Sequence, residues 1–86
     1  MIVSQETALL VWILRPSIDT LFVRYRVPPT AGIEILEEVL RTLDRKWSEI
    51  HDRPEWLLQA LRVSCLGYWR QRRRRIYSAI GPDLLF

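Results

Sequence analysis

The sequence has no asparagine and contains only one cysteine, one histidine, one lysine and three glycines among its 86 residues. A single cysteine, Cys65, excludes an intrachain disulfide, so we expect a reducing compartment and a cytoplasmic location. The apolar run over residues 8–14 is far shorter than the ~20 residues that a membrane span needs. Glu6 stands where a signal peptide carries positive charge. We therefore expect neither a signal peptide nor a transmembrane segment.

The residue types on which most enzymes depend are too few and too scattered to form a site. His51 stands at an expected break between two helices, and Cys65 lies in an apolar segment where burial would raise the pKa of its thiol. Neither has metal-ligand spacing with Asp52, and the three glycines form no phosphate-binding loop. We expect no enzymatic activity, no metal site and no cofactor.

The first third of the chain predicts a β-hairpin over about residues 7–27. Residues 7–15 are almost wholly apolar, which is typical of a buried strand or a short buried helix. Residues 16–19, beginning with proline, indicate a turn, and residues 20–27 alternate between apolar and polar positions as a half-buried strand does. If residues 7–15 are helical instead, the fold is all-α.

Two helices are expected after the hairpin, over about residues 31–50 and 54–80. In the first, apolar residues recur every three or four positions and form one stripe. The second begins at Asp52 and Glu55, which have the spacing of a capping box, and it ends at Gly81.

These elements predict a single small domain, residues 1–86, of the α+β class. The hairpin packs on the two helices, and a short apolar tail over residues 82–86 follows them. The second helix is apolar almost all round over residues 56–69 and changes its pattern after Gly67. It therefore bends there, or its C-terminal half packs on something different. Open hairpin edges and this uncovered helix predict a homodimer.

The expected order of strand, helix and helix over residues 20–70 resembles that of the ribbon–helix–helix DNA-binding proteins. In those proteins, outward side chains of a paired ribbon enter the major groove. Here they would be Phe22, Arg24 and Arg26. The resemblance is one of element order over about half of the chain, and we do not assign the chain to that family.

Arginines concentrate in residues 70–75, where five of the six positions are arginine. Residues 62–75 carry no acid, whereas residues 33–50 carry five acids against three bases. Arg73 stands one turn from both Trp69 and Tyr77 and could stack on either ring. It could instead extend its guanidinium to solvent or pair with an acidic residue of the first helix. The candidate binding residues are Arg70, Arg72, Arg73, Arg74, Arg75, Trp69, Tyr77, Arg24 and Arg26.

Positive charge beside stacking rings is typical of nucleic-acid-binding surfaces, and nucleic acid is the partner that we expect. The alternative is an interaction or assembly protein whose arginine-rich face docks on an acidic protein surface. Anionic lipid headgroups and a helix end that simply complements its own dipole stay open as well.

Overall fold

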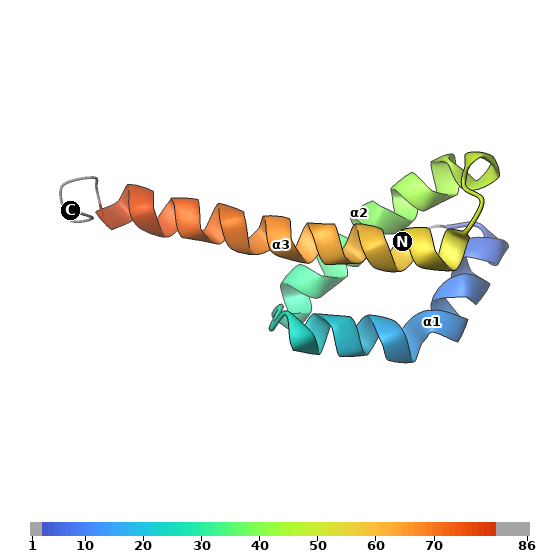
Figure 1. Ribbon diagram of the computed structural model, residues 1–86, viewed down its shortest axis with the longest axis horizontal. Helices are drawn as coiled ribbons and strands as arrows, with labels where there is room; N and C mark the ends of the chain where they lie inside the picture. The colour runs from blue at the N-terminus through green and yellow to red at the C-terminus, as the bar shows by residue number, and fades with distance from the viewer. Residues whose placement is uncertain (1–2, 81–86) are drawn as a thin grey trace.

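The computed structural model describes the backbone of residues 3–80 and the side chains of residues 3–72. It consists of α1 (Gln5–Arg24), α2 (Pro29–Arg45), the 3-10 turn η1 (Trp47–Glu49) and α3 (Arg53–Ile80), as Figure 1 shows. No strand occurs in this part of the chain. The all-α alternative is therefore confirmed, and the α+β prediction with a hairpin is wrong. The expected tail over residues 82–86 lies outside the described residues.

Residues 7–24 belong to one helix because the side chains that they bury recur every three or four positions. The inward side chains are Thr7, Leu10, Leu14, Ile18 and Leu21. Val23, which the strand pattern assigned to the buried face, is 76% exposed. The last residues of the expected strand form the final turn of α1 and the corner after it. No ribbon therefore presents Phe22, Arg24 and Arg26.

Pro16, which predicted the turn of the hairpin, lies inside α1. Its lack of an N–H removes one backbone hydrogen bond of the helix, and α1 is visibly bent along its length (Figure 1). The Thr20 hydroxyl donates to the Pro16 carbonyl over 2.8 Å. Helix formation thus tolerates this proline because neighbouring turns bury their apolar side chains in the core.

A Schellman motif ends α1 and turns the chain into α2. The Val27 N–H donates to the Phe22 carbonyl over 3.0 Å, and the Arg26 N–H donates to the Val23 carbonyl over 3.1 Å. Arg26 adopts the left-handed conformation, with φ at 53°, at a position where glycine is usual. Arginine is less suited than glycine to this conformation because its Cβ crowds the backbone.

The other end of α1 is held by Asp44 near the end of α2. The Asp44 carboxylate accepts hydrogen bonds from the Ser4 N–H at 3.2 Å and the Thr7 hydroxyl at 2.9 Å. Hydrogen bonding from the side chains of Ser4 and Thr7 and from the Ser4 backbone lowers the pKa of Asp44. Thr7 is fully buried, so its hydroxyl needs this partner.

α2 ends five residues before its expected end at Ile50 and is followed by η1. The Trp47 carbonyl accepts two hydrogen bonds from the Arg53 guanidinium, at 2.9 and 2.8 Å, and this guanidinium lies 4.3 Å from the Trp47 ring centroid. Asp52 then caps α3, because its carboxylate accepts from the Glu55 N–H at 3.2 Å. The capping role predicted for Asp52 is confirmed.

The three helices enclose one apolar core, and α3 extends well beyond it. The fully buried members are Leu40 and Leu43 of α2 and Leu57, Leu61 and Cys65 of α3. α3 has 28 residues and therefore spans ~42 Å. Its C-terminal half leaves the body formed by α1 and α2 (Figure 1). Within the residues that the structure describes, no helix combines the length and hydropathy that crossing a bilayer requires.

Candidate nucleic-acid interface

One hydrogen bond joins the corner after α1 to the second half of α3. The Trp69 indole Nε1 donates to the Tyr25 carbonyl over 2.6 Å, across 44 residues of sequence. Tyr25 lies between Arg24 and Arg26, and Trp69 directly precedes Arg70. The bond therefore brings the two basic segments of the chain to one end of the molecule. We call residues 70–75 the basic arm.

The aromatic residues before the basic arm hold one of its arginines. The rings of Tyr68 and Trp69 meet edge to face, with centroids 5.1 Å apart and an interplanar angle of 75°. The Arg72 guanidinium lies 5.9 Å from the Trp69 ring centroid and donates to the Tyr68 hydroxyl over 3.0 Å. Arg72 thus stacks on Trp69, a contact that the sequence analysis did not predict. The predicted contacts of Arg73 and Tyr77 lie outside the described side chains.

Arg24 and Arg62 line one hollow of about 330 Å³ between α1 and α3. Arg62 was not among the predicted binding residues, although it stands two helical turns before Trp69 and so shares its face. Its guanidinium donates to the Gln59 side-chain carbonyl over 3.0 Å. The spacing of seven residues between Arg62 and Trp69 was the sequence signal that could have identified Arg62 as a binding residue.

Arg26 lies on the other side of the corner from Arg24. It is exposed and lines a separate, mainly apolar hollow between α1 and α2. The two predicted residues of the corner therefore flank Tyr25 and do not share one hollow. Arg70 and Arg72 are exposed on α3, whereas nothing in the described side chains bears on Arg74 and Arg75.

The described basic residues of this region lack carboxylate partners. Within residues 3–72 the single ion pair is Arg15–Asp19, at 3.9 Å. Arg24 and Arg70 therefore keep guanidinium groups free to bind an anion, and Arg62 is bonded to an uncharged amide oxygen. Five donors in a fixed fork make each of them suited to phosphate oxygens.

The described residues at this end of the molecule include few side chains suited to catalysis or metal binding. Cys65 is fully buried, and burial raises the pKa of its thiol, as the sequence predicted. His51 is exposed at the opposite end, at the start of α3. Among the described residues, no three His, Cys, Asp or Glu side chains gather as a metal site would require.

No protein-family model, curated protein or solved structure matches the chain. The function therefore has to be inferred from the chemistry of its own residues. The feature with the most specific chemistry is the basic end of α3, together with the corner that Trp69 holds against it.

Proposed function

We propose that this chain is a non-enzymatic protein of the cytoplasm that binds nucleic acid, and that it also forms a homodimer. Binding is carried by the basic arm with Trp69 and Tyr77, supported by Arg24 and Arg26 of the corner. The observation that supports this proposal most is the Trp69–Tyr25 hydrogen bond, which unites two basic segments that lie far apart in the sequence. Clustered guanidinium groups contribute most of their binding energy through phosphate contacts.

The position of the arginines in α3 argues against a purely structural role. A helix dipole favours cations only within about the last turn, and α3 ends at Ile80. None of the arginines in residues 70–75 falls in that last turn. Their concentration is therefore better explained by an anionic ligand that follows the helix.

The test compares two double variants that lose the same charge. Arg70→Ala/Arg72→Ala removes two exposed arginines of α3, and Arg41→Ala/Arg45→Ala removes two exposed arginines of α2. Fluorescence anisotropy of labelled single-stranded RNA and duplex DNA is recorded with nuclease-treated protein from 50 to 300 mM salt. We expect micromolar or tighter binding near 150 mM salt for the wild type.

The α3 variant should bind at least tenfold more weakly, with a shallower salt dependence, because each lost phosphate contact lowers the slope by about one. The α2 variant should bind within about twofold of the wild type because its charges lie far from the arm. Absence of binding near 150 mM salt by folded wild type overturns the proposal. An acidic protein surface would then become the leading alternative, to be sought with the same α3 variant as control.

A further inference from the structure

One face of α3 is left uncovered where the helix leaves the body. Val63 is 59% exposed and Leu66 is 42% exposed, although both are apolar. A Cβ placed on Gly67 would meet no atom within 4 Å. Val63, Gly67 and Arg70 are spaced by four and three residues and so follow one face of the helix. An apolar strip with a glycine in its middle is well suited to close approach by another helix.

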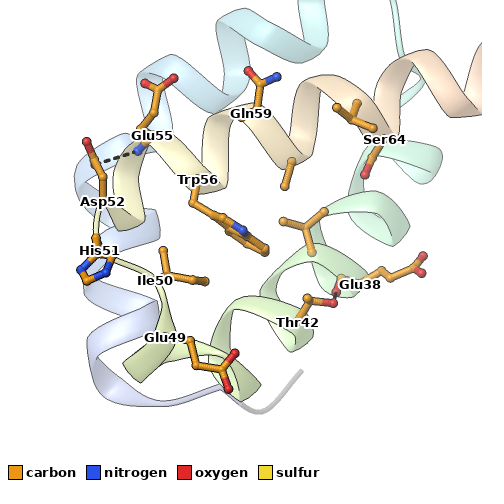
Figure 2. A pocket seen from close by; sticks show the side chains of 13 residues that line it. Glu38, Thr42, Glu49, Ile50, His51, Asp52, Glu55, Trp56, Gln59 and Ser64 are labelled. Carbon is orange, nitrogen blue, oxygen red and sulfur yellow. Dashed lines mark hydrogen bonds between the residues drawn. The ribbon is translucent and has the colours of Figure 1, made fainter.

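The same face continues into a groove between α2 and α3 of about 810 Å³. Four carboxylates line it, those of Glu38, Glu49, Asp52 and Glu55, and no arginine or lysine does. Figure 2 shows Glu38, Glu49 and Glu55 around its rim and the Trp56 ring pointing into it. The groove therefore offers an apolar floor and a negative rim.

The chain itself carries the complementary surface at the other end of α3. No acid occurs from Trp56 to Pro82, and the basic arm lies within this stretch. The rise of a helix separates Glu55 from Arg70 by ~22 Å. The arm therefore cannot reach the Glu55 end of the groove in its own molecule, but it can reach that end in another copy.

We propose that two copies pair through antiparallel α3 helices about a two-fold axis at the level of residue 65. This register sets Val63 of one copy against Gly67 of the other and brings residues 70–75 beside residues 55–60 of the other. Each basic arm then runs along the acidic groove of its partner. A parallel arrangement would bring the two arms together, so charge selects the antiparallel one. This inference deepens the proposed function. It rests on that proposal only for the existence of a homodimer.

The pairing leaves part of each arm available for nucleic acid. Arg72 stands two residues after Arg70, which turns it about 200° around the helix, and it is exposed beside the Trp69 ring, away from the pairing face. The dimer therefore presents two arms on separate faces. An isologous interface of this kind closes on itself and does not extend into fibres.

The first test uses Gly67→Leu, whose side chain has open space within one copy. Leucine also has the higher helix propensity, so this variant should fold at least as well as the wild type. The same side chain would stand where the partner's Val63 packs. Analytical ultracentrifugation from 1 to 100 µM should show a wild-type dimer and at least a tenfold weaker dimer for Gly67→Leu.

Two matched pairs of variants test the strip and the groove separately. Val63→Glu should abolish the dimer, while Val23→Glu, at an even more exposed valine of α1, should leave it intact. Two triple variants, each of which loses three negative charges, test the groove. Replacing Glu38, Glu49 and Glu55 by glutamine should weaken the dimer at least tenfold, whereas replacing Glu6, Glu34 and Glu37 should not.

A wild type that is monomeric at 100 µM overturns this inference, as does a dimer that Gly67→Leu and Val63→Glu leave unchanged. The proposed function is tested independently because Gly67→Leu retains every arginine. Nucleic-acid binding that survives in monomeric Gly67→Leu supports both proposals. Binding by a wild type that never dimerises refutes the pairing and the homodimer but not nucleic-acid binding, and a dimer that binds no nucleic acid refutes nucleic-acid binding alone.

Discussion

Replacing Arg26 by glycine should raise the free energy of unfolding and weaken the proposed binding of nucleic acid. With φ at 53°, its backbone lies in a region that costs an L-residue about 1–2 kcal/mol and glycine almost nothing. Arg26→Gly relieves this strain but also gives the unfolded chain more freedom, which offsets about 0.5–1 kcal/mol. The net gain in the free energy of unfolding should be about 0.5–1 kcal/mol, or about 2–8 °C in melting temperature.

The control for this substitution is Arg26→Ala, which removes the same charge but keeps a Cβ in the strained position. Calorimetry should give Arg26→Gly a higher melting temperature than either Arg26→Ala or the wild type. Anisotropy should show both variants binding nucleic acid more weakly, with a salt slope reduced by about one. A melting temperature of Arg26→Gly no higher than that of Arg26→Ala would refute the strain. Unchanged affinity in both would refute the role of this side chain in binding.

Three further substitutions test contacts that hold the fold together. Trp69→Phe removes the hydrogen bond to the Tyr25 carbonyl and should lower the free energy of unfolding by about 1 kcal/mol in urea titrations. Leu61→Ala truncates a fully buried side chain and should cost about 2–5 kcal/mol in the same assay. Because its pKa is lowered, Asp44 stabilises the fold above its ordinary value of 3.8 and loses this effect as the pH falls through the folded-state pKa. Asp44→Asn should therefore melt with less dependence on pH between 2 and 5 than the wild type.

α2 and α3 could be predicted from the sequence because the residues that indicate them lie within or next to each helix. A stripe of apolar residues at helical spacing marks the first, and the cap formed by Asp52 and Glu55 marks the start of the second. The end of α2 could not be read in the same way. Its stripe continues to Ile50, but the Arg53 guanidinium binds the Trp47 carbonyl and draws the chain into a 3-10 turn.

α1 was misread because both of its faces are apolar. Leu9, Trp12 and Ile13 are exposed although their side chains are large and apolar, so no polar stripe marks the outer face. Pro16 then suggested a turn where the helix continues. The inner face is selected by contacts with other elements, such as the bond from Thr7 to Asp44, which lie 37 residues apart. A window along the sequence cannot contain such a contact.

The sequence singled out the candidate binding residues but not the way in which the fold arranges them. Arg24 and Arg26 were placed beside the arm as the outward side of a strand, whereas a helix corner holds them there through Tyr25 and Trp69. Arg72 and Arg73 stand three and four residues after Trp69, and both spacings bring a side chain to the same ring. The sequence analysis considered only Arg73, which lies outside the described side chains. The structure places Arg72 over the Trp69 ring.

Repulsion between the arginines of the basic arm destabilises the C-terminal half of α3. A ligand that neutralises these charges should therefore stabilise this half. Arg70 and Arg74 are four residues apart, and Arg72 and Arg75 are three apart, so the helix brings like charges together. Each such pair destabilises a helix by about 0.2–0.5 kcal/mol. Cys65 is the last fully buried residue among the side chains that the structure describes, so little burial of described side chains opposes this repulsion. Phosphates or a partner's carboxylates would remove it, so any true ligand of the arm should slow hydrogen exchange of its backbone amides.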